Sequence, residues 1–316
     1  MNANDPNVAL LEIVAERLGD DLRDELVFVG GAVAGLLITD PAMPAIRPTD
    51  DVDTICQALA LADYHRIETR PRARGFVQDL TAEAPICRWR IKHVAVDVMP
   101  TLEKILGFSN RWYPLALATA QPIALPSGRP IRLLTAPVFL ATKLEAFDGR
   151  GKGDFLFSHD LEDLLAVIDG RASLLDECRA SPPELREYLA ARLASLLATR
   201  DFVDALSGHL PGDAACLVDL SHGPAAAREV TGGNNEAPRR RGGVCSAARR
   251  RIRRPRRGDP DDLAPRRGAA RTAVRRADRR PDRLRRLLTG FQRLNATRQS
   301  CVNSTCAAHC AVTVEA

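Results

Sequence analysis

The stretch TDDVDTI, residues 49–55, combines three carboxylates with the apolar pattern of a buried β-strand. Its valine and isoleucine are typical of a protein core, whereas Asp50, Asp51 and Asp53 carry charge. Burial of a carboxylate is costly unless the group is paired or bound to a metal. Because side chains alternate across a strand, Asp51 and Asp53 share one face and Asp50 lies on the other. The stretch therefore predicts a strand with two neighbouring carboxylates on one face and a solvated Asp50.

A third acid, Asp97, stands alone in a second apolar stretch, VAVDVMP at residues 94–100. If the two strands are neighbours in one sheet, the three carboxylates meet at one patch. Hard oxygen donors suit Mg²⁺ or Mn²⁺, and Mg²⁺ typically binds one or two carboxylates together with substrate phosphates. A pair of such ions activates an attacking oxygen and stabilises the leaving phosphates. Asp51, Asp53 and Asp97 are the predicted metal ligands.

Two adjacent glycines, Gly30 and Gly31, end the apolar run ELVFVGG and precede a predicted helix at residues 32–40. Backbone N–H groups at a helix N-terminus bind anions, and glycine lets phosphate oxygens approach the backbone closely. This turn and the acidic strand after it predict a site for a nucleoside triphosphate with its metal. Arg47, between the two, has two open interpretations, a contact to phosphate or an ion pair with Asp50.

Helices and strands alternate in the first part of the chain. The periodicity predicts a helix at residues 7–18, a second helix that starts within residues 57–63, and a hairpin over 122–134. Residues 87–100 suit either two strands or one long bent strand. The segments that follow, up to about residue 210, are helical throughout.

This order predicts an α+β protein in three parts. A nucleotide-handling domain with a mixed β-sheet and flanking helices spans 1–133, a helical domain spans 134–220, and an arginine-rich tail spans 221–316. Dense charge with few aromatic residues cannot offset the entropy of ordering, so the tail is predicted to be disordered. Two interpretations of the tail remain open: a basic arm that neutralises nucleic-acid phosphates, or non-native sequence with no selected role.

The eight cysteines and the apolar stretches bear on the compartment. The cysteines of the first part stand singly in apolar segments, which is typical of reduced core thiols. The terminal Cys301, Cys306 and Cys310 give only a weak metal signal. The chain shows neither a signal-peptide pattern nor an apolar stretch of about 18 residues. The sequence predicts a cytoplasmic protein without a membrane span.

The order of these motifs resembles the nucleotidyltransferase superfamily with the DNA polymerase β-like fold. Its signature is a strand, Gly-Gly or Gly-Ser, a helix, a D-x-D strand and a later single acid, here FVGGAVAG, RPTDDVD and VAVDVMP. More narrowly, the chain looks like the AbiEii/MenT-type nucleotidyltransferases, toxins of type IV toxin–antitoxin systems. Their downstream helical motif is matched by TKLEAFDGR and HDLEDLL, with Lys143, Arg150, Asp160 and Asp163 in place. The resemblance covers about residues 8–200.

The resemblance implies a reaction and its metal ligands. A hydroxyl attacks the α-phosphate of a nucleoside triphosphate, and pyrophosphate leaves. Asp51 and Asp53 bind the metals, and Asp97 binds the catalytic metal and helps to deprotonate the acceptor hydroxyl. Transfer RNA 3′ ends are acceptors for some members, and a cognate antitoxin is an implied partner.

The resemblance also implies how the phosphates are held. Gly30 and Gly31 hold the triphosphate, Lys143 reaches a phosphate as a point charge, and Asp160, favoured over Asp163, orients that lysine or the acceptor.

Two alternatives stay open beside the enzyme. The residue after the second glycine, often Ser or Thr in the superfamily, is Ala32 here, which favours a catalytically weak relative that binds a nucleotide or a partner protein. The basic tail favours a nucleic-acid-binding protein.

Overall fold

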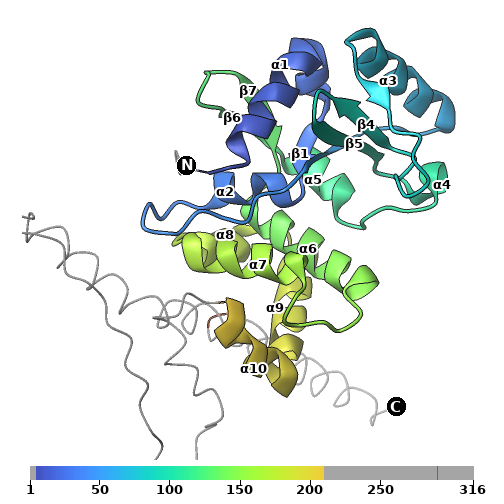
Figure 1. The fold of residues 1–316 in the computed structure, drawn as a ribbon. Helices are drawn as coiled ribbons and strands as arrows, with labels where there is room; N and C mark the ends of the chain where they lie inside the picture. Colours follow the sequence, from blue (N-terminus) through green and yellow to red (C-terminus); the bar gives the residue numbers. More distant parts are fainter. Residues whose placement is uncertain (1–4, 210–289, 291–316) are drawn as a thin grey trace, which may run out of the picture.

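The computed structural model describes residues 5–209 and Gly290 (Figure 1). Apart from Gly290, the predicted tail lies outside the described residues, as do Cys216, Cys245, Cys301, Cys306 and Cys310. Residues 5–209 contain a seven-stranded sheet in the order β3-β4-β5-β2-β1-β7-β6. Its strands are β1 (Val27–Val29), β2 (Asp51–Cys56), β3 (Val77–Gln78), β4 (Arg88–Ile91), β5 (Val94–Pro100), β6 (Gln121–Ala124) and β7 (Pro130–Leu133). The β2–β5 and β1–β7 pairs are parallel and the other neighbours antiparallel, so the predicted mixed sheet is confirmed.

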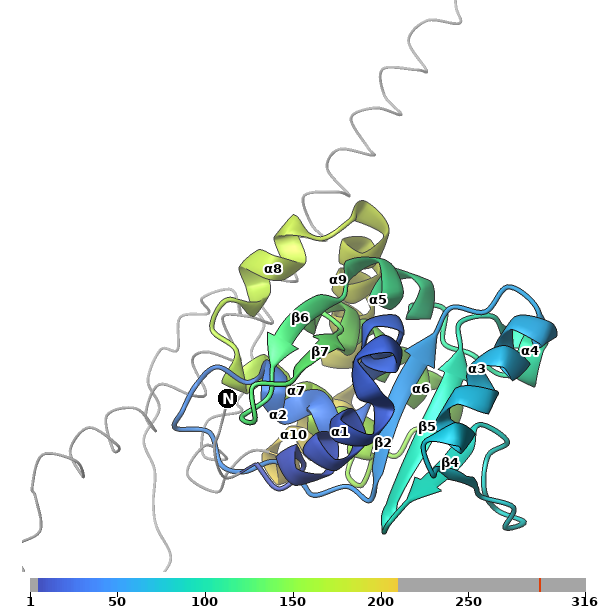
Figure 2. The same cartoon turned by 90° about the horizontal axis from the view of Figure 1, so that it is seen from above.

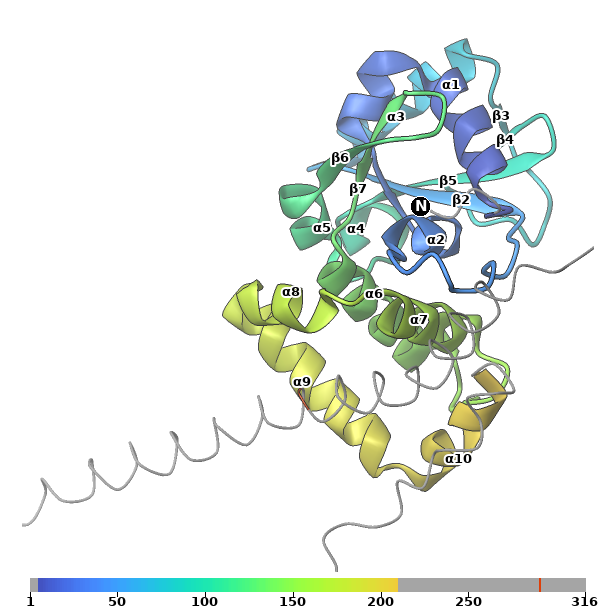
Figure 3. The same cartoon turned by 90° about the vertical axis from the view of Figure 1, so that its left-hand side faces the viewer.

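Helices flank this sheet and then continue alone. Within the sheet region they are α1 (Val8–Glu25), the 3₁₀ turn η1 (Gly31–Val33), α2 (Ala34–Leu37), α3 (Leu61–Ala73), α4 (Glu103–Leu106) and α5 (Tyr113–Thr119). After it come α6 (Ala136–Arg150), α7 (His159–Gly170), α8 (Leu174–Ala180), α9 (Pro183–Ala198) and α10 (Arg200–His209). Figures 1 and 3 show α6 to α10 on the side of the sheet opposite α1 and α3. The α+β class is confirmed, and the domain boundary at residue 133 stays a prediction.

Strands β2 and β5 are neighbours in the middle of the sheet and carry the three acids. They pair in parallel from Asp51 opposite Ala95 to Cys56 opposite Pro100, and Figure 2 shows them side by side. Helix α1 covers the face away from the acids with fully buried leucines, among them Leu11 and Leu22. Burial of such a side chain contributes about 1.5–3 kcal/mol. The packed face therefore holds the strands in place while the opposite face carries charge.

Helix α1 begins where the sequence predicted it and continues farther. It runs to Glu25 past a break at Gly19, whose φ of 69° and ψ of 170° are not helical. Glycine tolerates this backbone because it has no Cβ.

The helix predicted at residues 32–40 is wrong in length. The segment is one 3₁₀ turn followed by the four-residue helix α2, which ends at Leu37. The backbone N–H groups of Thr39 and Asp40 donate to the carbonyl of Gly170 at the end of α7, at 3.0 and 2.9 Å. This docking onto α7 takes the donors that a longer helix would use. The glycine turn therefore precedes a single 3₁₀ turn rather than a full helix.

Residues 87–100 form two strands, which settles the alternative left open by the sequence. Lys92, with a φ of 54°, and His93 make a two-residue turn between β4 and β5. The turn fixes the antiparallel register, so Ile91 lies opposite Val94 and Arg88 lies opposite Asp97. Directly opposite residues of an antiparallel pair share one face of the sheet. Arg88 is thereby placed on the acidic face.

The described cysteines agree with the prediction of core thiols. Cys56, Cys87 and Cys178 are buried and free, and burial raises the pKa of each thiol to about 12. Trp89 and Trp112 are also in the core. In the part of the chain that the structure describes, no helix has the length and apolar character needed to cross a membrane.

Candidate functional site

A cavity of about 860 Å³ lies between the acidic face of β2 and β5 and the helices α6 and α7. Its lining contains the predicted site residues Gly30, Gly31, Arg47, Asp51, Asp53, Asp97, Lys143 and Asp160, whereas Asp163, the less favoured alternative to Asp160, is not part of it. These residues come from positions up to 130 apart in the chain and reach one cavity through the sheet order and the packing of α6 on α7. Their chemical roles stay predictions.

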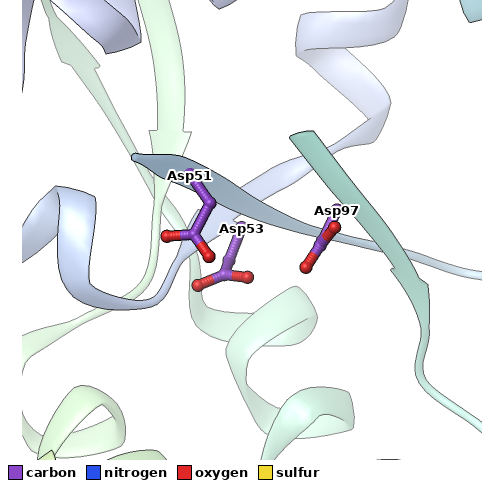
Figure 4. A group of neighbouring side chains, drawn as sticks. All are labelled: Asp51, Asp53 and Asp97. Atoms are coloured by element: carbon purple, nitrogen blue, oxygen red, sulfur yellow. The ribbon is translucent and has the colours of Figure 1, made fainter. Parts of the chain in front are cut away.

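The three predicted metal ligands converge. Asp51 and Asp53 lie two residues apart on β2, and Asp53 is the register partner of Asp97 on β5. One carboxylate oxygen of each lies within 4.8 Å of the others. Figure 4 shows the three side chains extending from the two strands into the same space. The alternation argument therefore places the acids correctly, and Asp50 is exposed as predicted.

The ionised form of the Asp53 carboxylate is unfavourable in the metal-free protein. Desolvation raises its pKa to about 7, and the negative charges of Asp51 and Asp97 add to the increase. The cationic Lys143 and Arg150 act in the opposite direction without cancelling it. A bound cation would favour the ionised form by an opposite charge at short range. The site is therefore an anion cluster that gains from a positive ligand.

An arginine that the sequence analysis did not single out lies in this cluster. Arg88 Nε donates to Asp97 Oδ1 and Arg88 Nη2 to Asp97 Oδ2, each at 2.8 Å. The same Nη2 donates to Asp51 Oδ2 at 3.2 Å. Asp97 is buried, so the bidentate pair supplies the partner that a buried carboxylate requires.

The donor set fits a divalent cation. Asp51, Asp53 and Asp97 each supply a hard oxygen donor. Among the described residues, Arg88 is the only cationic side chain bonded to Asp51 and Asp97. When all three acids are ionised, the group therefore keeps a net charge of two negative charges. Magnesium and manganese prefer oxygen ligands of this kind. The cavity of about 860 Å³ also leaves room for phosphates beside the acids. The cavity thus combines oxygen ligands, a net negative charge and enough space for a metal with bound phosphates.

Metal binding is expected to depend on pH through Asp53. The carboxylate must lose its proton to bind a cation, and its pKa is raised to about 7. We therefore expect weak Mn²⁺ binding at about pH 6 and tighter binding at about pH 8. Calorimetry in buffers of different ionisation enthalpy should show proton release at the lower pH. Affinity that is equal at both pH values would contradict a proton on Asp53.

Gly30 is required by its contact with Asp53. Its φ of 75° and ψ of −167° belong to a region that is almost restricted to glycine. A Cβ added to Gly30 would overlap Asp53 Oδ2 and lie 2.7 Å from Asp53 Cβ. The turn therefore brings bare backbone against the acidic strand.

The variant Gly30→Ala should displace Asp53 and lose Mn²⁺ binding. Gly107→Ala is the matched control, because Gly107 has a φ of 81° but no atom within 4 Å of an added Cβ. It should lose stability only by the cost of backbone strain, about 1–3 kcal/mol. Isothermal calorimetry with Mn²⁺ and thermal unfolding compare the two. Equal metal affinity in both variants would show that the contact with Asp53 is unimportant.

A second charged group faces the glycine turn from α6 and α7. Lys143 Nζ lies 2.7 Å from Asp163 Oδ2 and 3.2 Å from Asp160 Oδ1. Arg150 donates two hydrogen bonds to Asp160, each at 2.9 Å. A Cβ on Gly31 would lie 3.0 Å from Asp163 Oδ2 and 3.9 Å from Lys143 Nζ. Lys143 and Asp163 of the downstream motif thus lie against the turn.

The charges of this group balance in spite of burial. Burial lowers the pKa of Lys143, but the negative Asp163 and Asp160 outweigh it and hold the pKa above the ordinary lysine value. Burial likewise raises the pKa of Asp160, yet hydrogen bonds from Arg150 and the charge of Lys143 bring it below its usual range. Asp163 keeps a raised pKa because burial dominates there. Lys143 is therefore a buried, charged lysine with fixed partners.

Arg47 pairs with α7 instead of Asp50. Its Nε lies 3.4 Å from Glu162 Oε2, and its Nη2 lies 3.8 Å from Asp163 Oδ2. The interpretation as an Asp50 partner is wrong, because the ion pairs of Arg47 among the described residues are with Glu162 and Asp163 on α7. Its other interpretation, a phosphate contact, stays a prediction.

Two polar residues missed in the sequence hold the segment before β2. Asn7 donates from Nδ2 to the carbonyl of Arg47 at 3.1 Å and accepts from the backbone N–H of Thr49 at 2.9 Å. Thr49 Oγ1 then donates to Asp51 Oδ1 at 2.6 Å. An asparagine before a helix carries no signal for so distant a contact.

Comparisons with known proteins add little to this site. A scan against protein-family models gives no match, and a search of curated proteins gives none either. Among solved structures the chain is similar to the antibiotic-resistance factor ANT(2'')-Ia, with a TM-score of 0.36 and 16% identity over 60% of this chain and 94% of that one. At this similarity, function has to be argued from the residues of the chain itself.

Proposed function

We propose that the chain is a metal-dependent nucleotidyltransferase that transfers a nucleoside monophosphate from a nucleoside triphosphate to a hydroxyl acceptor. The observation that carries the proposal is the convergence of Asp51, Asp53 and Asp97 beside a glycine turn, in a cavity that also contains cationic side chains. Three neighbouring acids alone would indicate only an excess of negative charge. Acids, bare backbone and cations in one cavity are the parts that a triphosphate and its metal require.

The acids hold the metal in this proposal, and the other side of the cavity holds the phosphates. Asp51, Asp53 and Asp97 would bind Mg²⁺ or Mn²⁺, which when bound neutralises phosphate charge. The backbone of Gly30 and Gly31 approaches the triphosphate without a Cβ in the way.

The cationic side chains complete the phosphate site. Lys143 and Arg47 line the cavity beside the glycine turn and supply positive charge for the phosphates. Asp160 holds Lys143 in place.

The reaction is a substitution at the α-phosphorus. The acceptor hydroxyl oxygen forms a bond to this phosphorus, the bond to the bridging oxygen breaks, and pyrophosphate leaves with the electron pair. Asp97 receives the proton of the hydroxyl. The contribution of the chain is positioning and electrostatics, as expected for phosphoryl and nucleotidyl transfer.

The narrower proposal is that the acceptor is an RNA 3′ end, such as that of transfer RNA, and that the enzyme acts as a type IV toxin in the cytoplasm with a cognate antitoxin. It is supported by the match of TKLEAFDGR and HDLEDLL to the toxin motif. The exposed rings of Phe108 and Phe157 line the cavity and offer surfaces for base stacking.

Nucleotides labelled at either end test the reaction. The chain is incubated with Mg²⁺, total RNA and each nucleoside triphosphate, labelled at the α- or the γ-phosphate. Label from the α-position should enter RNA and label from the γ-position should appear in pyrophosphate, and a chelator should stop both. The absence of product with every nucleotide and acceptor would refute the enzyme.

The second candidate function is that of a catalytically weak nucleotidyltransferase relative, which binds the nucleotide without turnover. The observation that favours it is that Arg88 engages both oxygens of Asp97. Calorimetry that gives tight nucleotide binding in a preparation without transfer would support this candidate over the enzyme.

A further inference from the structure

Arg88 occupies the oxygens that a metal would use. Its guanidinium donates to both oxygens of Asp97 and to Oδ2 of Asp51. The contact follows from the β4–β5 register, which places Arg88 directly opposite Asp97. The position of the guanidinium is therefore built into the sheet.

A guanidinium and a divalent cation cannot both hold these carboxylates at full strength. Like charges at short range repel, and a partly buried site screens the repulsion less than water does. The side chain of Arg88 is 23% exposed and that of Asp97 is 8% exposed. Entry of a cation among Asp51, Asp53 and Asp97 therefore weakens the hold of Arg88 on its partners.

A guanidinium displaced from these acids would remain at the cavity, because Arg88 belongs to its wall. Arg88 lines the cavity wall together with Asp51 and Asp97, and its backbone is fixed in β4. A planar guanidinium with several N–H donors matches phosphate oxygens as well as it matches a carboxylate. A bound triphosphate would offer such oxygens next to the metal.

We propose that Arg88 exchanges partners: it neutralises Asp51 and Asp97 in the metal-free protein, and it binds the triphosphate once a divalent cation has taken its place. This inference rests on the proposed metal site. It assigns to Arg88 two opposite effects, competition with the metal alone and support of the metal–nucleotide complex.

The test compares two affinities in the variant Arg88→Ala. Mn²⁺ alone should bind about tenfold or more tightly than in the wild type, because the guanidinium that competes for Asp51 and Asp97 is gone and close charge pairs are coupled by at least that much. Mn²⁺ with a non-hydrolysable nucleoside triphosphate should bind about tenfold or more weakly. An arginine with a merely structural role would weaken both.

Arg90→Ala is the matched control. Arg90 lies two residues along the same strand and pairs with Asp79 at 2.6 Å, outside the acidic group. Its removal should change neither affinity.

Arg88→Lys carries the test if the alanine variant does not fold. A lysine is a point charge without the bidentate geometry, so the two shifts should keep their signs and be smaller. Affinities that shift in the same direction, or that do not shift, overturn the exchange. If neither the wild type nor the variants bind Mn²⁺, the metal site itself fails and the inference fails with it.

Discussion

Replacing Asp53 by asparagine is expected to lower the rate of nucleotidyl transfer by about a thousandfold or more, with the protein still folded. Loss of a ligand removes several kcal/mol of charge stabilisation by the metal, and each 1.36 kcal/mol is about tenfold in rate. Asparagine has nearly the same shape and fits the same position. Single-turnover transfer with labelled nucleotide measures the effect.

The same substitution should make the metal-free protein more stable. Burial raises the pKa of Asp53 from 3.8 to about 7, so the stability that its proton contributes is fully present below pH 3.8 and is lost as the pH rises through about 7. At about pH 8 the ionised group is unfavourable, and Asp53→Asn removes it. Thermal unfolding at that pH, without metal, should show a higher midpoint for the variant.

Asp50→Asn is the matched control for both measurements. Asp50 is exposed and directly precedes β2. It should keep its transfer rate and its midpoint. An Asp53→Asn variant that works like the control would show that the carboxylate takes no part in the reaction.

Replacing Lys143 by methionine is expected to lower the free energy of unfolding by about 3–5 kcal/mol, the usual cost of leaving a buried charge without its partner. The side chains of Lys143 and Asp163 are 8% and 3% exposed, so solvent screens this pair little. Asp160 would keep its two hydrogen bonds from Arg150, whereas Asp163 would keep only Arg47 at 3.8 Å. The loss should therefore come mainly from Asp163. Denaturant unfolding measures it.

The double variant Lys143→Met with Asp163→Asn tests that reason. Removal of both charges should recover a large part of the stability, because no unpaired carboxylate is left. Lys104→Met is the control, since Lys104 is exposed on α4. A single variant as stable as this control would show that the pair contributes nothing.

The acidic strand and its neighbours could be predicted because their signals are local. Alternation along residues 49–55 places Asp51 and Asp53 on one face, and a lone acid in an apolar run indicates the second strand. The meeting of Asp97 with them depended on the sheet order, which the sequence left as a condition. The register of β2 and β5 now meets that condition.

Arg88 could have been found, whereas the short helix could not. Once Lys92 and His93 are taken as a two-residue turn, the register alone puts Arg88 opposite Asp97. The end of α2 depends on hydrogen bonds from Thr39 and Asp40 to the end of α7, far along the chain. Tertiary contacts of that kind override local helix propensity.

The metal site is tested most directly by diffraction from crystals of the chain soaked in Mn²⁺ with a non-hydrolysable nucleoside triphosphate. The account predicts an anomalous peak about 2.0–2.2 Å from oxygens of Asp51, Asp53 and Asp97, with the triphosphate against Gly30. A peak at another place, or a nucleotide bound without metal while Arg88 stays bonded to Asp51 and Asp97, would contradict it.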